Sequence, residues 1–429
     1  MYRKIEDKLK KWKKNFKKPF MLIGPRQTGK TYIVTEFCKN NFDNFLYFDV
    51  KKDTEISDVF EKTIDPEKII NSIELIKGIT IDVENTVIFF DEVQVSERLI
   101  ESLKYFCDSD KNYKIIVAGS LLGVKINRFN SSFPVGKVSI NYLYPMDFEE
   151  FLWANENNNL MDLIRKCFEE KKPLGQLMHR EAMDYFKQYL IVGGMPQAVE
   201  TYIKTKSFKE VDLIKRDILN LYKDDIVKYS GDDSIKVQSI FEEIPSQLQK
   251  HEKRFSFNSM QKDARYRDYK DAFFWLQESM IVNIAFNTTE PNIGLRLNRE
   301  SSALKCYMGD TGLLLSLAFD EKGLVDEEIY RKILFNKLTF NEGMIMENIV
   351  AQMLTATGKK LYFYFNYDKQ NSANNMEIDF LIAKNKITSK HNISPIEVKS
   401  GKNYTFSSLN KFKNKYKEYL STSYVLHIE

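Results

Sequence analysis

The chain has 429 residues, more than one hydrophobic core supports, so about two to four domains are expected. Its 43% hydrophobic and 13% aromatic residues exclude wholesale disorder, and its four cysteines and four histidines lie too far apart for a zinc ribbon or a disulfide framework. The net charge is only +4, no apolar run reaches the length of a membrane span, and the lysine-rich start lacks the apolar core of a signal peptide, so a cytoplasmic protein is expected.

The first motif is a glycine loop at residues 24–31, which fits G-x-x-x-x-G-K-[ST] in full. An apolar run precedes it and a helical pattern follows over residues 31–40, the context that this phosphate-binding motif requires. Backbone N–H groups of such a loop, with the positive end of the following helix, bind a polyphosphate. A chance glycine turn at a strand end is the alternative. The residues expected to bind the nucleotide are Gly24, Pro25, Arg26, Gln27, Thr28, Gly29, Lys30 and Thr31.

Two side chains at the end of the loop have separate expected roles. Lys30 is placed to reach the β- and γ-phosphates, and the hydroxyl of Thr31 is placed to bind Mg²⁺. A nucleoside triphosphate, taken as ATP, and Mg²⁺ are therefore the first expected partners.

Two further apolar runs, at residues 45–50 and 85–92, are typical of buried parallel strands, and the second ends in a pair of acids. Asp91 is expected to bind Mg²⁺, directly or through water, and Glu92 to polarise the water that attacks the γ-phosphate. The alternative is an acid pair that only caps a helix. A fourth strand ends in Ser120, where a hydroxyl would sense the γ-phosphate, although serine commonly ends strands.

Together with residues 133–138 and 143–151, these motifs resemble the prokaryotic AAA-type ATPases that carry a carboxy-terminal domain of long-unassigned function. The resemblance implies an α/β fold with a P-loop AAA-type ATPase core over residues 1–155 and a helical lid over residues 156–228. It also implies assembly into rings, so a homo-oligomer is an expected partner, with a monomer as the alternative.

Two positions bear on how such a ring would complete its active site. Many members of the family have Gly-Arg where this chain has Gly136 and Lys137, which puts an arginine finger in question. Arg128 is the nearest candidate for that finger, and a surface loop cation is the alternative reading of it.

The helical stretch is interrupted at residues 192–196 by Gly-Gly-x-Pro, which breaks a helix by restoring backbone freedom and removing a donor. The resemblance implies that Pro196 lies near the adenine. A purely structural helix break is the alternative.

Residues 229–300 are expected to form a winged helix, with helical patterns around residues 235–248, 257–259 and 269–280 and a wing strand at residues 281–284. Cations interleaved with Tyr266 and Tyr269 favour duplex DNA as a partner, bound mainly through phosphates. A protein-binding spacer is the alternative. The cations are Lys250, Lys253, Arg254, Lys262, Arg265, Arg267 and Lys270.

Residues 301–429 resemble the PD-(D/E)xK core of restriction-endonuclease-like proteins, because Glu347 on a helix precedes Asp379, Glu397 and Lys399 on strands. Alternation along a strand puts Glu397 and Lys399 on one face. Asp379 and Glu397 would share Mg²⁺ or Mn²⁺, Lys399 would stabilise the attacking hydroxide, and Glu347 would bind the metal through water. A solvated Glu–Lys pair is the alternative.

Two functions follow from these patterns. One is an ATPase whose nucleotide state controls a metal-dependent nuclease that acts on DNA. The other is an ATP-dependent switch whose carboxy-terminal half binds DNA or a protein without cutting. A P-loop kinase or transferase is a third candidate. The acid after Asp91 argues against it, because a carboxylate at that position indicates water as the acceptor of the phosphoryl group.

Overall fold

The computed structural model describes residues 1–120, 122–126, 133–250, 252–292, 294–319, 327–334, 342–384, 390–401 and 404–427. The chain divides into two compact units. The amino-terminal unit comprises Met1–Met146 with Glu278–Met280, and the carboxy-terminal unit comprises Asp147–Gln277 with Ile281–Glu429. Within the described ranges, no helix has the length and apolar character needed to cross a membrane.

The amino-terminal unit is built on a five-stranded sheet in which every pairing is parallel, in the order β2-β3-β4-β1-β5. Because parallel strands end at the same edge, the glycine loop after β1, the acids Asp91 and Glu92 at the end of β3 and the serine after β4 share one edge of the sheet. The strands are β1 (Phe20–Ile23), β2 (Asn44–Asp49), β3 (Thr86–Asp91), β4 (Lys114–Gly119) and β5 (Ser139–Tyr142).

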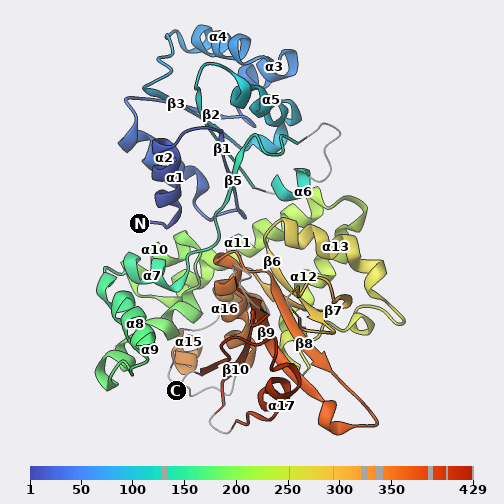
Figure 1. Cartoon of the computed structure of the whole chain (residues 1–429). Helices are drawn as coiled ribbons and strands as arrows, with labels where there is room; N and C mark the ends of the chain where they lie inside the picture. The colour runs from blue at the N-terminus through green and yellow to red at the C-terminus, as the bar shows by residue number, and fades with distance from the viewer. Residues whose placement is uncertain are drawn as a thin grey trace. The chain divides into compact units, whose positions relative to one another are not determined.

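Helices cover both faces of this sheet (Figure 1). Successive residues of β1 point to opposite faces, so Met21 and Ile23 pack against α3, α4 and α5, whereas Phe20 and Leu22 pack against α1 and α2. This burial on both faces explains why the strands are continuous apolar runs. The helical segments are α1 (Ile5–Lys14), α2 (Lys30–Asn41), α3 (Thr54–Lys62), α4 (Pro66–Lys77), the 3₁₀ turn η1 (Val93–Val95), α5 (Glu97–Asp108) and α6 (Leu122–Ile126).

The carboxy-terminal unit contains a mixed six-stranded sheet in the order β11-β10-β9-β8-β6-β7. The β6–β8 and β10–β11 pairs are parallel, and the other pairs are antiparallel. The strands are β6 (Val282–Thr288), β7 (Arg299–Met308), β8 (Leu361–Asn366), β9 (Met376–Ala383), β10 (Ile393–Lys399) and β11 (Tyr424–His427).

The expected wing belongs to this larger sheet. The strand expected at residues 281–284 is part of β6, which pairs with β7 on one side and with β8 on the other. The domain boundary expected between residues 300 and 301 falls inside β7. The helix expected near residue 257 is only the three-residue 3₁₀ turn η3 (Phe257–Ser259), because Phe257 packs on Phe255 and Phe273 rather than starting an apolar stripe.

Helices make up the rest of this unit, and α16 packs against β7 and β10 of the sheet. They are α7 (Phe148–Ala154), α8 (Asn158–Glu170), α9 (Gln176–Val192), α10 (Pro196–Thr205), α11 (Phe208–Tyr229), α12 (Ser234–Gln249), α13 (Tyr266–Glu278), α14 (Thr311–Ala318), α15 (Glu327–Leu334), α16 (Glu342–Ala356) and α17 (Ser407–Tyr416), with the 3₁₀ turns η2 (Gly231–Asp233) and η4 (Ser372–Asn374).

Two glycine motifs that lie far apart in the sequence meet in this unit. Asp310 accepts hydrogen bonds from the backbone N–H groups of Gly194, at 2.6 Å, and Leu313, at 2.9 Å. A Cβ at Gly193 would stand 2.3 Å from Asp310 Oδ1, and one at Gly312 would stand 2.5 Å from the carbonyl oxygen of Val192. The close approach of the two backbones requires both glycines.

Candidate functional site

The glycine loop is shaped by backbone conformations that favour glycine and by a close backbone contact. Gly29 caps α2 with φ +83°, and Gln27 also has a positive φ of +65°. A Cβ at Gly24 would lie 2.4 Å from the carbonyl oxygen of Leu143, so only glycine fits beside β5. The side chain of Thr28 is buried and its hydroxyl donates to the Pro25 carbonyl over 2.9 Å, which ties the two ends of the turn together.

Lys30 lies folded over this loop. Its Nζ donates to the carbonyl oxygens of Gly24, at 3.0 Å, and Pro25, at 2.8 Å. Burial lowers the pKa of Lys30 to about 8, against the opposing effects of the negative charges of Glu92 and Asp91. The ammonium of Lys30 thus lies within the loop that the motif assigns to phosphate binding.

The two oxygen groups expected at the Mg²⁺ are in contact. The hydroxyl of Thr31 donates to Asp91 Oδ2, and the other carboxylate oxygen of Asp91 accepts from the backbone N–H of Glu92 at 2.9 Å. Burial raises the pKa of Asp91, and the hydrogen bond from Thr31 opposes that effect. Glu92 has φ +55°, so the chain turns sharply where the strand ends.

Sequence reasoning missed Gln94, which contacts the expected catalytic glutamate. Gln94 Nε2 donates to Glu92 Oε2 over 2.5 Å. On its other side the amide lies against β4, where a Cβ at Gly119 would stand 2.4 Å from Gln94 Oε1. Ser120, at the end of the same strand, has a buried hydroxyl oxygen with no hydrogen-bond partner among the described residues. The structure thus places the buried hydroxyl of Ser120 at the same sheet edge as Glu92.

A second residue that sequence reasoning missed is Arg3, which lies before α1 and is 4% exposed. Its guanidinium donates to the carbonyl oxygen of Thr28 in the glycine loop, at 3.2 Å, and to that of Tyr144 after β5, at 2.7 Å. Arg3 therefore joins the loop to the neighbouring strand end. A lone arginine in a basic amino-terminal stretch gives no sequence signal for this role.

Two residues are considered for an arginine finger, and only one of them lies in the described part of the chain. Lys137 pairs with the carboxylate of Asp108, and both side chains are exposed. Arg128 lies outside the described residues. Pro196, expected near the adenine, is the first residue of α10 in the carboxy-terminal unit.

The second set of predicted site residues comes together on the side of the six-stranded sheet that faces α16. Glu347 comes from α16, Asp379 from β9, and Glu397 with Lys399 from β10. Lys399 Nζ lies 2.5 Å from Glu397 Oε2, and Asp379 Oδ2 accepts from the backbone N–H of Val398 at 2.8 Å. The four residues that the sequence singled out therefore lie close together in the structure.

The same cluster holds side chains that the sequence did not indicate. Lys305 of β7 is 1% exposed, and its Nζ lies 2.8 Å from Glu377 Oε1, 3.5 Å from Glu347 Oε2 and 3.7 Å from Asp379 Oδ1. Lys253 pairs with Glu347 Oε1. We call Lys253, Lys305, Glu347, Glu377, Asp379, Glu397 and Lys399 the carboxylate–lysine cluster.

Burial and charge shift the pKa values within the carboxylate–lysine cluster. Burial, with the negative charge of Glu347, raises the pKa of Asp379 to about 7. Burial also raises the pKa of Glu397, which contact with Lys399 opposes. Burial alone would lower the pKa of Lys305, but the surrounding carboxylates outweigh it and the pKa is well above its usual value. Among the described residues, no group of three or more His, Cys, Asp or Glu side chains is arranged to hold a metal ion.

The basic residues expected to contact DNA divide into two groups. Lys253 is used inside the carboxylate–lysine cluster, and Arg254 lies 2.6 Å from Glu252 with its guanidinium 3.6 Å from the ring centroid of Phe365. The other group is exposed and lies at the end of α12 and at the start of α13; it consists of Lys250, Lys262, Arg265, Arg267 and Lys270.

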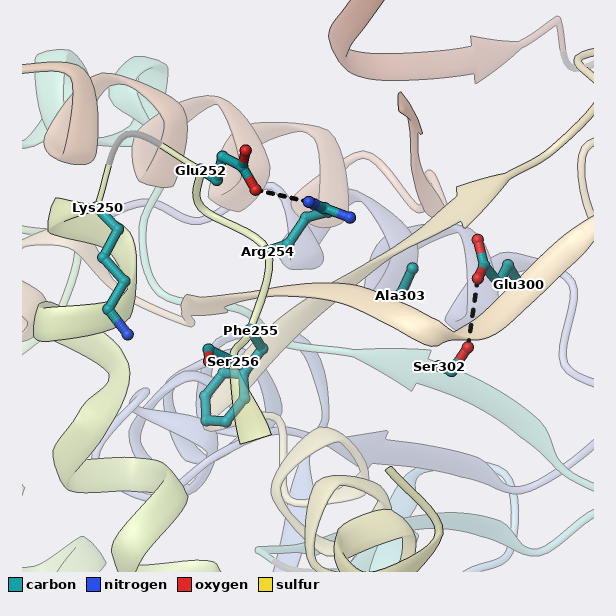
Figure 2. Close-up of a pocket in the computed structure, with 8 residues that line it drawn as sticks. All are labelled: Lys250, Glu252, Arg254, Phe255, Ser256, Glu300, Ser302 and Ala303. Atoms are coloured by element: carbon teal, nitrogen blue, oxygen red, sulfur yellow. Dashed lines mark hydrogen bonds and ion pairs between the residues drawn. The ribbon is translucent and has the colours of Figure 1, made fainter. Parts of the chain in front are cut away.

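Figure 2 shows a pocket of about 610 Å³ beside Arg254, between the segment that follows α12 and the start of β7. Its charged side chains are two cations, Lys250 and Arg254, and two acids, Glu252 and Glu300. Balanced charges of this kind do not indicate an anion site.

Comparison with known proteins identifies three regions of the chain. Residues 16–152 match the family described as AAA domain. Residues 183–323 and 342–429 match two families described as domains of unknown function (DUF8612 and DUF4143). No curated protein matches the chain. The expected AAA domain is therefore confirmed over residues 16–152, and the winged helix and the nuclease-like domain stay predictions.

Similar solved structures include a Walker-type ATPase of Pyrococcus abyssi, with 16% identity and a TM-score of 0.43 over 74% of this chain and 95% of that chain. The Aeropyrum pernix ORC2 protein has 13% identity and a TM-score of 0.38, over 78% and 94% of the two chains. Cdc6p of Pyrobaculum aerophilum has 12% identity and a TM-score of 0.25, over 78% and 93%. These TM-scores are too low to carry an argument. The assignment of an AAA domain therefore rests on the family match and on the geometry of the glycine loop.

Proposed function

We propose that the amino-terminal unit hydrolyses ATP and that the nucleotide bound there controls attachment of the carboxy-terminal unit to nucleic acid. The observation that carries the first part is the meeting of the glycine loop, Asp91, Glu92 and Ser120 at one edge of the parallel sheet. Two features support a polyphosphate as the ligand: the backbone at Gly24 packs too closely for a side chain, and the ammonium of Lys30 donates to neutral carbonyls that phosphate oxygens can replace.

In this proposal the loop binds the phosphates through its backbone N–H groups, and Lys30 moves from the Gly24 and Pro25 carbonyls to the β- and γ-phosphates. Thr31 and Asp91 would hold Mg²⁺, which would neutralise charge on the β- and γ-phosphate oxygens. Their existing contact keeps both oxygen ligands on one side of the loop.

Glu92 is the proposed base. Its carboxylate orients a water and takes up a proton as the water oxygen bonds to the γ-phosphorus and the bond to the β-phosphate oxygen breaks. Gln94 holds the Glu92 carboxylate in place, and the hydroxyl of Ser120 is free to bond a γ-phosphate oxygen. A carboxylate at this position supports water, rather than another acceptor, as the nucleophile.

The proposed nucleic-acid contacts come from the exposed cations around α13. Arg265, Arg267 and Lys270 are exposed within one and a half turns of the helix start, a spacing that suits contact with successive phosphates. Such contacts predict strong salt dependence and little sequence preference. A protein partner is the alternative, and weak dependence on salt would favour it.

One set of measurements tests the proposal. Wild-type protein should release phosphate from ATP with no added acceptor, and Lys30→Ala and Glu92→Gln should each lower that rate at least about a hundredfold. Glu92→Gln should still bind ATP without hydrolysing it. The affinity of this ATP-bound variant for duplex DNA can then be measured by fluorescence anisotropy. Equal DNA affinity with ATP and ADP would contradict nucleotide control, and absence of phosphate release would contradict the ATPase.

Metal-dependent cleavage of DNA is the second candidate for the carboxy-terminal unit. Glu397 favours it, because its Oε1 is buried without a partner while Lys399 contacts its other oxygen. Incubation of plasmid with Mg²⁺ or Mn²⁺ tests it, and cleavage should be lost in Glu397→Ala and Lys399→Ala. The contacts of Lys305 instead favour binding without cleavage.

A further inference from the structure

We propose that Lys305, a cation built into β7, takes the place of a divalent metal among the carboxylates of the carboxylate–lysine cluster. The resemblance to restriction-endonuclease-like proteins implies Mg²⁺ or Mn²⁺ bound by Glu347, Asp379 and Glu397, and the arrangement of this cluster does not fit that ion. The inference does not depend on the ATPase or on nucleic-acid binding.

The position of the Lys305 ammonium is the first step. Its Nζ lies within 3.7 Å of oxygens from Glu347, Glu377 and Asp379, which come from α16 and β9. A divalent ion would need these oxygens at about 2.0–2.6 Å around a common centre. The ammonium of Lys305 lies at the point on which they converge.

The remaining oxygens of the expected metal ligands are mostly engaged. Glu347 Oε1 pairs with Lys253, and Glu347 Oε2 accepts from the hydroxyl of Tyr307 at 3.0 Å. Asp379 Oδ2 accepts from the Val398 backbone N–H, and the other oxygen, Oδ1, is the one that lies near Lys305. These contacts hold the Glu347 and Asp379 carboxylates in position without a metal ion.

Charge balance leads to the same conclusion. Four carboxylates, Glu347, Glu377, Asp379 and Glu397, meet three ammonium groups, Lys253, Lys305 and Lys399. The cluster is thus nearly neutral, and an added divalent ion would be repelled by the ammonium of Lys305, which is only 1% exposed. Lys305 Nζ also lies 5.2 Å from the ring centroid of Phe363, an aromatic contact that further favours a cation at this position.

This inference is tested by titrating the full chain with Mn²⁺ in the absence of nucleotide. The paramagnetic signal of the free ion gives the number of Mn²⁺ ions bound. Wild type and Asp379→Asn should bind the same number of ions, since Asp379 holds none. A loss of one Mn²⁺ in Asp379→Asn, with an unchanged melting temperature, would overturn the proposal. This comparison needs no change at Lys305.

A gain-of-site variant provides the second arm. Lys305→Met removes the charge and ends one atom short of the lysine ammonium, which frees that space for an ion, so the variant should bind one Mn²⁺ more than wild type, with at least about a tenfold increase in affinity at that site. Adding Asp379→Asn to it should abolish the extra ion. Lys411→Met is the matched control, because Lys411 Nζ donates to the backbone carbonyls of Ser372 and Asn375 rather than to carboxylates. A folded Lys305→Met variant that gains no ion would contradict the proposal.

Discussion

Gln94 Nε2 lies 2.5 Å from Glu92 Oε2, so the proposed base of the ATPase is held by a side chain only two residues further along the chain. The positive φ of Glu92 turns the backbone at the end of β3, which brings the two side chains to the same side. Gln94 is buried, and the neighbouring strand meets it at Gly119, where there is no side chain. The position of the Glu92 carboxylate therefore depends on β4 as well as on β3.

Replacement of Gln94 by Glu should lower kcat for ATP hydrolysis. The new carboxylate removes the donor and repels Glu92, so we expect a loss of about tenfold to a hundredfold with little change in KM. Steady-state phosphate release measures both constants. Gly119→Ala, which displaces Gln94, should give a similar loss, and the double variant should be no worse than the poorer single variant. Additive losses would show that Gln94 acts independently of Gly119.

Gly24→Ala should disable nucleotide binding. The added Cβ would stand 2.4 Å from the Leu143 carbonyl oxygen, and Leu143 is itself fixed by a 2.8 Å hydrogen bond from its N–H to Ile23. We expect at least tenfold weaker ATP binding and about 1–3 kcal/mol lower stability from overpacking. Isothermal titration and urea denaturation measure these effects. Gly401→Ala is the control, since a Cβ there meets nothing within 4 Å.

Arg3→Met should raise KM for ATP while leaving kcat nearly unchanged. The variant removes the donors to the Thr28 and Tyr144 carbonyls, and hydrogen bonds from a charged group contribute about 1.5–3 kcal/mol, enough for a tenfold or larger effect on affinity. Arg3→Lys should recover only part of the loss, because an ammonium cannot span both carbonyls as the planar guanidinium does. A fall in kcat with KM intact would assign Arg3 to the chemical step.

Affinity for ATP should fall as pH rises above about 8. Burial lowers the pKa of Lys30 in the nucleotide-free protein to about 8, so its ammonium is present below that pH and is lost above it. If only the ammonium form binds the phosphates, affinity should drop by about tenfold per pH unit in the alkaline range. Equilibrium titration at several pH values measures this. Lys30→Arg, weaker but always charged, should show a flat profile, and a flat wild-type profile would contradict the assignment.

Asp212→Leu should destabilise the carboxy-terminal unit. This fully buried carboxylate accepts from Ser316 and Tyr330, each at 2.6 Å, and pairs with Arg216 at 2.8 Å. Removal of one partner of a buried ion pair costs about 3–5 kcal/mol. Urea denaturation should show that loss, whereas Asp233→Leu, which breaks a partly exposed pair with Lys236, should change stability by less than about 1 kcal/mol.

Some of the fold was predictable from residue patterns. The continuous apolar runs correctly placed the buried parallel strands, since burial on both faces leaves no alternation. The pairing of the expected wing strand was harder to predict. The residue pattern at 281–284 is the same whether the segment forms a two-stranded wing or part of β6 between β7 and β8. The helix expected near residue 257 is only a 3₁₀ turn, in which the ring of Phe257 packs on that of Phe273. Local residue patterns do not predict such a contact between distant positions.

The sequence by itself determined the phosphate-binding loop and the acids after β3, because their chemistry depends on neighbouring backbone groups and on a strand end. It also indicated which carboxylates would gather around β9 and β10. Only the tertiary structure decided what neutralises them. Lys305 reaches Glu347 and Asp379 across 42 and 74 positions of sequence because β7 and β9 lie in one sheet under α16. Arg3 and Gln94 likewise acquire their roles through burial against other strands, and burial is a property of the packed chain.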